Sequence, residues 1–327
     1  MAVILVTGGA GYIGSHACRA LAAAGHVPVA FDNLSTGWAG AARFGPFIRG
    51  NLTDRAALDA AFAAHRPEAV MHFAAKSLVG ESMADPGLYW RENVTGALTL
   101  LEAMRAAGCR RIVFSSTCAT YGDQDGVLLD EDTAQRPTTA YGASKLAIEH
   151  MLRDFAGAHG LEAVIFRYFN VAGAAADGTI GEQHSPETHL IPLALDAALG
   201  RRPALTLHGT DYPTPDGTCI RDYVHVEDLI DAHLAGLERL LSGAGGGTYC
   251  LGTGHGFSVR EVIAAASGIT GRDVPVIEGP RRPGDAARLV SAGHRAGTAL
   301  GWRPGRSTPE RMIADAWAWH QGPGYEA

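Results

Sequence analysis

The N-terminus places a short apolar run directly before a series of glycines. Val3-Ile4-Leu5-Val6 is apolar and rich in β-branched residues, which predicts a buried strand. Gly8, Gly11 and Gly14 follow with the spacing G-x-x-G-x-x-G. Such glycines allow a tight turn into a helix and let backbone N–H groups approach a diphosphate, which the helix N-terminus also attracts. This feature restricts the chain to α/β folds whose first turn can hold phosphate groups.

An acidic residue ends the second predicted strand. The apolar run Val27 to Phe31 is followed by Asp32. A carboxylate at this distance from a glycine turn hydrogen-bonds the adenosine ribose of a dinucleotide. It would repel a 2′-phosphate, and Asn33 offers no counter-ion, so the sequence favours NAD over NADP. The alternative is a glycine turn that binds nothing; strand, glycines, helix and acid in this order disfavour it.

Strands and helices alternate through the first half of the chain. Helices are predicted around residues 54–64, 86–107 and at Tyr141, and strands at residues 69–73, 111–115 and 161–168. This alternation predicts a parallel sheet covered by helices on both faces, with ligands at the carboxyl ends of the strands. The residues that follow these strands are therefore expected to face a ligand: Asn51, Phe73-Ala74-Ala75, Ser115-Ser116-Thr117 and Tyr168-Phe169-Asn170.

The length and the second half of the chain predict two domains. At 327 residues the chain exceeds the size at which single cores usually stop growing. We predict that residues 1–170 form the dinucleotide-binding domain and that residues 171–327 mainly form a smaller substrate domain. The chain is expected to return to the large sheet around residues 221–252, with a helix at 224–240 and a strand at 249–251. A last helix around 309–319 carries Trp317 and Trp319, which we assign to packing.

Charge and cysteine content exclude several classes of protein. A net charge of −7 leaves no electrostatic footprint for nucleic acid or an anionic membrane. No apolar run approaches the length of a membrane span, and the N-terminus lacks the pattern of a cleavable signal. Five cysteines are odd in number, widely spaced and free of C-x-x-C pairs, which predicts reduced thiols in a cytoplasm.

Tyr141 and Lys145 lie one helical turn apart, so their phenol and ammonium groups share a helix face. A neighbouring cation lowers the pKa of a phenol because it favours the phenolate. The pair therefore predicts a base that acts on a hydroxyl. Tyrosine and lysine also meet at this spacing by chance, as a solvated pair on a helix. The glycine loop and Thr117 favour the catalytic interpretation.

These motifs resemble the extended short-chain dehydrogenase/reductase family, and within it the nucleotide-sugar epimerases. The similarity spans nearly the whole chain. Its N-terminal pieces are Val6-Thr7-Gly8-Gly9-Ala10-Gly11-Tyr12-Ile13-Gly14, Phe31-Asp32-Asn33-Leu34, His72-Phe73-Ala74-Ala75 and Tyr141-Gly142-Ala143-Ser144-Lys145. The epimerases in particular are indicated by Asp211-Tyr212-Pro213-Thr214, Arg221-Asp222-Tyr223-Val224-His225-Val226 and Arg281-Arg282-Pro283-Gly284-Asp285.

The resemblance implies a Rossmann-type doubly wound parallel sheet, a smaller C-terminal α/β domain for a UDP-sugar, and a homodimer; whether the helices near Pro86 and Tyr141 form its interface stays open. It implies NAD-dependent C4 epimerisation of UDP-glucose and UDP-galactose through a 4-keto intermediate. Tyr141 would be the base, Lys145 would bind the nicotinamide ribose, and Thr117 would hydrogen-bond the reacting oxygen. The implied cofactor-binding residues are Gly8, Gly11, Tyr12, Ile13, Gly14, Asp32, Asn33, Asn51, Leu52, Phe73, Ala74, Ala75, Asn93, Ser115, Tyr141, Lys145 and Tyr168.

Substrate contacts are implied for Thr117, Tyr141, Asn170, His189, Leu190, His208, Arg221, Arg282 and Asp285. The two arginines are expected to clamp the diphosphate, because a guanidinium donates in a planar fork. The chain departs from the family at His189, where asparagine is common, at His208, where an apolar or aromatic residue often meets uracil, and at Asn51, which replaces an aspartate. Leu289 occupies a position that gates the 2-substituent of the sugar, and its intermediate size leaves N-acetylated sugars open.

Cys118-Ala119 stands where dehydratases of the family carry an Asp-Glu pair, and related decarboxylases a glutamate, so their chemistry is disfavoured. The open alternatives are a 4-epimerase of UDP-GlcNAc/UDP-GalNAc or of UDP-xylose/UDP-arabinose, and a non-catalytic NAD-binding regulatory protein. The latter typically loses the tyrosine or lysine. The spacing of Glu182, His184, Glu187 and His189 matches no familiar zinc pattern, so no metal is expected, and this loop is expected to fold over substrate.

Overall fold

A parallel sheet forms the larger part of the computed structural model, which describes residues 1–124, 126–282 and 284–326. Pro283, part of one epimerase-like motif, lies outside the described residues. The sheet has seven strands in the order β10-β6-β5-β4-β1-β2-β3. Its strands are β1 (Val3–Thr7), β2 (Val27–Asp32), β3 (Phe47–Arg49), β4 (Ala69–His72), β5 (Arg111–Ser115), β6 (Glu162–Tyr168) and β10 (Gly247–Leu251).

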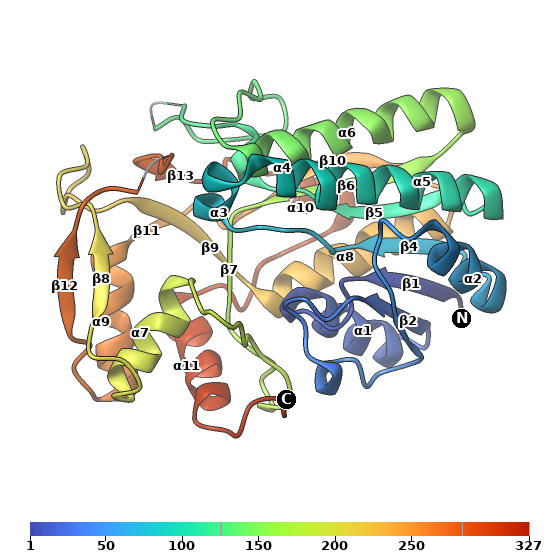
Figure 1. Ribbon diagram of the computed structural model, residues 1–327. Coiled ribbons are helices and arrows are strands. Elements are labelled where there is room, and N and C mark those ends of the chain that lie inside the picture. The colour runs from blue at the N-terminus through green and yellow to red at the C-terminus, as the bar shows by residue number, and fades with distance from the viewer. Residues whose placement is uncertain (125, 283, 327) are drawn as a thin grey trace.

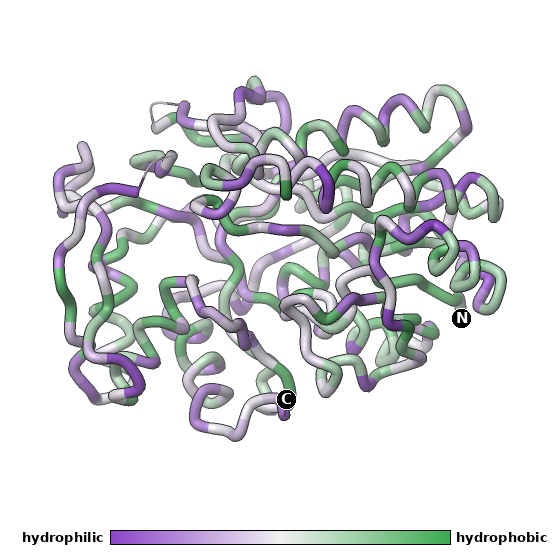
Figure 2. Tube along the Cα trace, in the orientation of Figure 1, coloured by the Kyte–Doolittle hydropathy of each residue, from purple (hydrophilic) through white to green (hydrophobic). Residues whose placement is uncertain are grey.

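Helices cover both faces of this sheet (Figure 1). Successive residues of a strand point to opposite faces, so Ile4 and Val6 join one buried cluster while Leu5 joins the other. The first face is covered by α1 (Tyr12–Ala23), α8 (Val226–Leu241) and α10 (Arg295–Leu300). The second is covered by α2 (Arg55–His65), α5 (Gly96–Ala107) and α6 (Ala140–His159). Figure 2 shows the resulting hydrophobic character of the central strands between more hydrophilic outer helix faces.

The strand order reverses between β1 and β4, which is where a ligand crevice forms in a sheet of this type. Thr7 and His72 end these two strands, and the Thr7 hydroxyl lies 2.7 Å from Nδ1 of His72. Burial lowers the pKa of His72 to about 3, and the charge of Lys145 lowers it further. A neutral, hydrogen-bonded pair thus joins the two strands directly below the crevice.

A smaller layer of strands and helices faces the carboxyl edge of the large sheet (Figure 1). In it, β9 (Ile220–His225) pairs with β7 (Asn170–Ala172), β11 (Gly256–Ser258) and β13 (Arg288–Leu289), while β8 (Leu205–His208) pairs with β12 (Val276–Gly279). A separate buried cluster lies between α7 (Leu190–Ala198), α9 (Val259–Thr270) and α11 (Pro309–His320). Trp317 packs against this cluster, and Trp319 is buried, as predicted for packing residues.

The predicted helices and strands of the first half are confirmed, with differences at their ends. The helix predicted over residues 86–107 is divided into α4 (Pro86–Tyr89), the π-helical turn η2 (Trp90–Thr95) and α5. The helix predicted from Val224 begins at Val226, because Val224 belongs to β9 and the His225 side chain accepts a hydrogen bond from the N–H of Glu227. The short elements α3 (Val79–Ala84), η1 (Ala39–Ala41) and η3 (Cys118–Thr120) were not predicted, and the strand expected before Asn51 is β3.

The chain returns to the large sheet through α8 and β10, and β10 pairs in parallel with β6. The division into a dinucleotide domain and a substrate domain remains a prediction. In the part of the chain that the structure describes, no helix combines the length and the hydrophobicity needed to cross a bilayer.

Candidate active site

A cavity of about 870 Å³ lies between the carboxyl edge of the large sheet and the smaller layer. Most of the residues predicted to bind cofactor or substrate line it, from segments far apart in the sequence. They are Gly8, Gly11, Tyr12, Ile13, Gly14, Asp32, Asn33, Asn51, Leu52, Phe73, Ala74, Ala75, Thr117, Tyr141, Tyr168, Asn170, His189, Leu190, Arg221, Arg282, Asp285 and Leu289.

The glycine loop lines the cavity, and its backbone packs so closely that side chains at two of its glycines would not fit. Gly8 has φ +75°, and a Cβ there would lie 2.7 Å from the backbone nitrogen of Ala74. A Cβ at Gly14 would overlap the carbonyl oxygen of Gly8. Gly11 is the N-cap of α1 and provides no side-chain cap, so the first N–H groups of this helix remain available to an anion.

Asp32 ends β2 on the wall of the same cavity. Its carboxylate accepts hydrogen bonds from the backbone N–H groups of Ala10, at 3.1 Å, and Leu34, at 2.8 Å. Burial raises the pKa of Asp32, while these backbone hydrogen bonds lower it. The carboxylate is thus fixed beside the glycine loop, in the position where a ribose hydroxyl would reach it. Together, the bare loop, the uncapped helix and this carboxylate fit NAD.

Tyr141 and Thr117 bring the predicted base and its hydrogen-bond partner together. The Thr139 side chain accepts a hydrogen bond from the N–H of Gly142, which begins α6 at Ala140 and presents Tyr141 from its first turn. Burial raises the pKa of Tyr141, and the nearby Tyr168 raises it further. A hydrogen bond with the Thr117 side chain has the opposite effect. Burial has the larger effect, so the pKa of Tyr141 lies above its ordinary value.

Lys145 lies behind the cavity wall rather than on it. Its ammonium nitrogen donates to the carbonyl oxygen of Ser115 at 2.8 Å and stands 4.9 Å from the centre of the Phe114 ring. Burial lowers the pKa of Lys145 to about 7, although the charge of Glu149 raises it. The lowering of the Tyr141 pKa by Lys145 stays a prediction. In the structure, the group that lowers the pKa of Tyr141 against the effect of burial is Thr117.

Two other predicted cofactor residues also lie behind the wall and hold it in place. The Asn93 amide accepts from the N–H of Lys76 at 2.7 Å and donates to the Lys76 carbonyl and the Ser144 hydroxyl. The Ser115 hydroxyl lies 2.9 Å from Nε2 of His233, and its carbonyl receives Lys145. Asn93 therefore fixes the segment that follows β4, whose Ala74 and Ala75 form part of the cavity wall.

Guanidinium groups from the smaller layer also line the cavity. Arg221 donates to the carbonyl oxygens of Ile220, at 3.0 Å, and Ala286, at 2.8 Å, and one of its nitrogens lies 3.6 Å from Asp285. Arg282 also lines the cavity. Arg202 lines it as well and was not predicted, although its position beside Arg201 in an otherwise uncharged loop was a signal. Three guanidinium groups thus face the space into which a diphosphate would extend.

His208 is the predicted substrate residue that lies farthest from this arrangement. It ends β8, its Nδ1 is 3.3 Å from the carbonyl oxygen of Pro280, and it is not part of the cavity wall. Its predicted contact with uracil therefore gains no support from the geometry. The pairing between β8 and β12 places it there, and no pattern in the sequence indicated that pairing.

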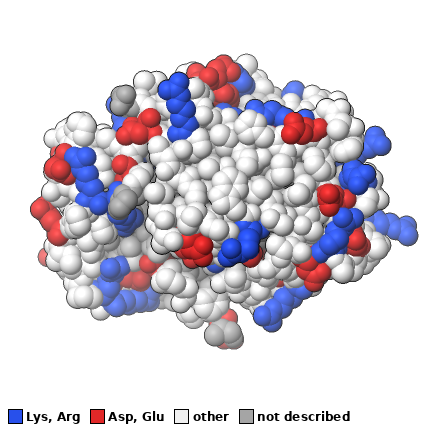
Figure 3. Space-filling view, turned by 45° about the horizontal axis from the view of Figure 1, so that its top comes forward, with Lys and Arg blue, Asp and Glu red and all other residues white. Residues whose placement is uncertain are grey.

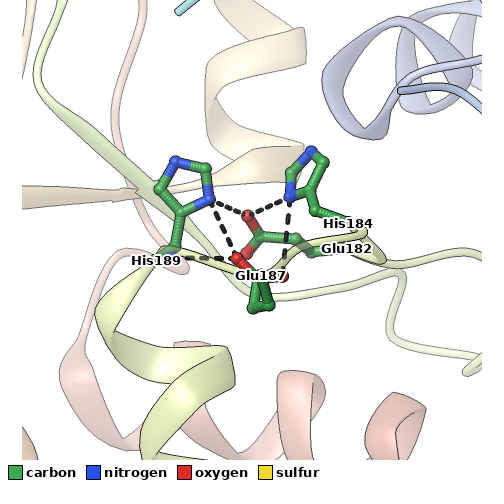
Figure 4. Close-up of side chains that lie close together, drawn as sticks. All are labelled: Glu182, His184, Glu187 and His189. Carbon is green, nitrogen blue, oxygen red and sulfur yellow. Dashed lines mark hydrogen bonds and ion pairs between the residues drawn. The ribbon is translucent and has the colours of Figure 1, made fainter. Parts of the chain in front are cut away.

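The loop before α7 gathers four charged or titratable side chains on another part of the wall (Figure 4). They are Glu182, His184, Glu187 and His189, and Nδ1 of His189 lies 2.6 Å from Glu182. Burial would lower the pKa values of both histidines, but Glu182 and Glu187 raise that of His184 to about 9 and that of His189 to about 10. The sequence spacing did not predict this convergence.

Comparison with known proteins now identifies the family. Residues 4–252 match the model of the NAD dependent epimerase/dehydratase family. The chain belongs to this family. It is 50% identical over 317 residues to a UDP-glucose 4-epimerase of Rhizobium leguminosarum bv. trifolii, with 97% of each chain covered.

Solved structures agree. That of UDP-glucose 4-epimerase from Brucella ovis, in complex with NAD, is 47% identical, with a TM-score of 0.94 and 97% of this chain and 98% of the other covered. A UDP-glucose 4-epimerase from Stenotrophomonas maltophila, with bound NAD and formylated UDP-arabinopyranose, is 39% identical, with a TM-score of 0.93 and 98% of each chain covered.

Proposed function

We propose that this protein interconverts UDP-glucose and UDP-galactose by NAD-dependent epimerisation at C4. The observation that carries the proposal is a single cavity lined by three groups of residues: the glycine loop with Asp32, the pair Tyr141 and Thr117, and the guanidinium groups of Arg221 and Arg282. These groups suit a dinucleotide, a reacting sugar and the diphosphate of a nucleotide-sugar. The relatives named above have the same activity in their names.

The chain's own residues move a proton at the sugar 4-hydroxyl. As the phenolate, Tyr141 takes this proton when the sugar is oxidised, and the resulting phenol returns it to the same oxygen when the sugar is reduced. Thr117 lines the same cavity and is placed to donate a hydrogen bond to that oxygen. Bound NAD supplies the acceptor and donor of the hydride. Between the two steps the 4-keto sugar must turn over, and a cavity of about 870 Å³ gives it room.

The residues after Thr117 support epimerisation over loss of water. Cys118 and Ala119 line the cavity where an acid and a base would be needed for dehydration. Burial raises the pKa of the Cys118 thiol to about 12, so the thiol is neutral at physiological pH. A thiol with so high a pKa is a poor acid, so protonation of a leaving hydroxyl lacks an effective donor at this position.

The decisive variant is Tyr141→Phe, which removes only the hydroxyl. We expect turnover of UDP-galactose to fall by at least roughly 10²–10⁴-fold, the usual contribution of a general base. Bound NAD, measured after denaturation, should stay at the wild-type level. Tyr89→Phe is the matched control, because the Tyr89 hydroxyl donates to the carbonyl oxygen of Leu78 and its ring stands 6.3 Å from that of Tyr141. Near-normal turnover in Tyr141→Phe would reject the mechanism.

The identity of the sugar is tested by comparing UDP-glucose and UDP-galactose with other UDP-sugars. The Stenotrophomonas structure holds a UDP-pentose derivative, and Leu289 lines the cavity at the position predicted to gate N-acetylated sugars. The purified protein should therefore be incubated with UDP-glucose, UDP-galactose, UDP-GlcNAc and UDP-xylose, and the products separated. Faster conversion of UDP-glucose supports the proposal, and selective conversion of a pentose or of UDP-GlcNAc overturns it. Product formation of any kind excludes the non-catalytic alternative.

We further propose a cytoplasmic homodimer. All five cysteines are free and buried, which suits a reducing compartment. Trp90 and Leu98, on η2 and α5, are exposed at 44% and 39% and offer apolar surface beside α6 for a second copy. On the face drawn in Figure 3, positive and negative side chains are interspersed instead of forming one basic patch. Sedimentation at micromolar concentration tests the assembly, and Trp90→Glu should yield monomers.

A further inference from the structure

The loop between Glu182 and His189 directs four metal-ligating side chains to one point (Figure 4). Glu182 and Glu187 each offer a carboxylate oxygen, and His184 and His189 each offer Nδ1. These four atoms all lie within 4.8 Å of one another. The spacing along the chain is Glu-x-His-x-x-Glu-x-His, so the convergence arises from the fold of the loop and not from a helix face.

The nitrogen–oxygen separations in the cluster are close to those between neighbouring ligands of a zinc ion. Nδ1 of His184 lies 3.3 Å from Oε1 of Glu182 and 3.5 Å from Oε2 of Glu187, and Nδ1 of His189 lies 3.4 Å from the other oxygen of Glu187, Oε1. Zinc bonds to nitrogen and oxygen of about 2.0–2.1 Å place neighbouring tetrahedral ligands about 3.3–3.4 Å apart. The pair His189–Glu182 is closer, at 2.6 Å, and a small rotation of the carboxylate would bring it to the same spacing.

Nδ1 of His184 is a buried nitrogen that makes no hydrogen bond. It faces both carboxylates at ion-pair distance, but the geometry does not satisfy a hydrogen bond to either. A buried polar atom without a partner is costly, and each such atom calls for an explanation. An ion at the centre of the cluster would satisfy it.

The charge of the cluster also favours a divalent ion. The side chains of Glu182 and Glu187 are exposed at only 5% and 12%, and in the described part of the chain their ion pairs are with these two histidines alone. Two buried carboxylates need two compensating positive charges. Two imidazolium rings with centroids 5.3 Å apart would repel each other. One divalent ion bound by neutral imidazoles supplies the same charge without that repulsion.

The backbone that carries the ligands is held independently of any ion. The indole N–H of Trp319 donates to the carbonyl of Glu182, and that of Trp38 donates to the carbonyl of Gln183, both at 2.9 Å. The backbone N–H groups of Thr188 and His189 donate to Glu187 at 2.7 and 2.9 Å. Such supporting contacts preorganise ligands, as in established metal sites.

We propose that Glu182, His184, Glu187 and His189 bind one zinc-class divalent ion in a tetrahedral site. Two imidazole nitrogens and two carboxylate oxygens in this geometry suit zinc, whereas magnesium and calcium prefer all-oxygen sites with more ligands. Because the protein fills all four positions, the ion has a structural role: it ties the loop to the start of α7 on the cavity wall. The proposal does not depend on which sugar the enzyme converts.

Zinc binding by the full chain, purified without a histidine tag and stripped with EDTA, tests this site. Zinc content is measured by elemental analysis, and affinity by competition with a chromophoric chelator. We expect one zinc per chain, and at least roughly 100-fold weaker binding in His184→Gln and in Glu187→Gln. The matched control is His26→Gln with Glu238→Gln, which removes a histidine–glutamate pair 2.8 Å apart elsewhere and should bind zinc as the wild type does.

Two further readouts separate a metal site from a folding defect or a surface contaminant. Zinc should raise the unfolding temperatures of the wild type and of the control above their values in EDTA, whereas His184→Gln should unfold at the same temperature with zinc as with EDTA. Cobalt(II) in the wild type should show the intense visible absorption of tetrahedral coordination. The proposal is overturned if the wild type takes up no zinc, if His184→Gln binds it equally well, or if cobalt gives only weak octahedral absorption.

Discussion

Glu149 on α6 is the centre of a buried network directly beneath the active site. Its carboxylate accepts hydrogen bonds from the Arg167 guanidinium at 3.0 and 2.7 Å, from the Ser116 hydroxyl at 2.5 Å and from the Gln135 amide at 3.1 Å. The Glu149 and Arg167 side chains are exposed at 1% and 5%. We therefore predict that Glu149→Gln is strongly destabilising.

The expected cost follows from what the substitution leaves behind. Arg167 would keep bonds to the Tyr121 hydroxyl and the Glu131 carbonyl, both neutral groups, and its charge would be buried without a counter-ion. Removing one partner of a buried pair costs about 3–5 kcal/mol. Glutamine still offers one neutral acceptor of the same shape, so we expect the lower end of this range. In urea, this corresponds to a fall of the unfolding midpoint by roughly 1 M or more.

Urea unfolding followed by tryptophan fluorescence and by circular dichroism measures this effect. The control is Asp59→Asn, which removes an exposed pair with Arg55 and should change the free energy of unfolding by less than about 0.5 kcal/mol. In the double variant with Arg167→Met, the loss should be smaller than the sum of the two single losses, because no buried charge is left unpaired. A Glu149→Gln midpoint equal to that of Asp59→Asn would refute the reasoning.

Three more outcomes are expected. Gly14→Ala should lose bound NAD, measured by its absorbance after denaturation, because the new Cβ overlaps the Gly8 carbonyl; Gly157→Ala, in open space on α6, should keep it. Burial lowers the pKa of Lys145 to about 7, whereas in the unfolded chain this side chain stays protonated to higher pH. The free energy of unfolding of the wild type, measured by urea titration, should therefore rise by about 2 kcal/mol between pH 7 and 9, and Lys145→Met should abolish this rise. Leu289→Tyr, which enlarges a side chain on the cavity wall, should reduce turnover of UDP-GlcNAc more than that of UDP-glucose, and equal losses would contradict the predicted gating.

The sheet side of the active site was predictable because its signals are local. The Val3–Thr7 strand, the glycine loop and Asp32 lie within one strand–helix–strand unit, and periodicity identifies each part. The rule that ligands meet the carboxyl ends of parallel strands then brought in Asn51, Phe73 and Thr117, all of which line the cavity. Sequence reasoning placed Lys145 on the correct helix, but its hydrogen bond to the Ser115 carbonyl depends on the register between α6 and β5.

The smaller layer was less predictable because its contacts join distant segments. Strands of two to six residues, such as β13 and β9, carry too few positions for a periodic pattern, and their pairing joins residues 288–289 to residues 220–221. His208 was assigned to substrate from sequence resemblance alone, and its strand pairing turns it to the Pro280 carbonyl instead. The convergence of Glu182 with His189 likewise needs a loop conformation that residue spacing does not encode.

Burial has opposite consequences on the two sides of the cavity. At the sheet, it favours the neutral forms: the pKa values of Tyr141 and Cys118 are raised, and that of Lys145 is lowered. At the loop before α7, carboxylate and imidazole groups lie close enough to keep each other charged despite burial, so the pKa of Glu182 is lowered and that of His184 raised. The phenolate of Tyr141 is therefore the costly form at the sheet, and it gives up its charge when it takes the sugar proton. The arginines on the cavity wall are left to bind the anionic part of a substrate.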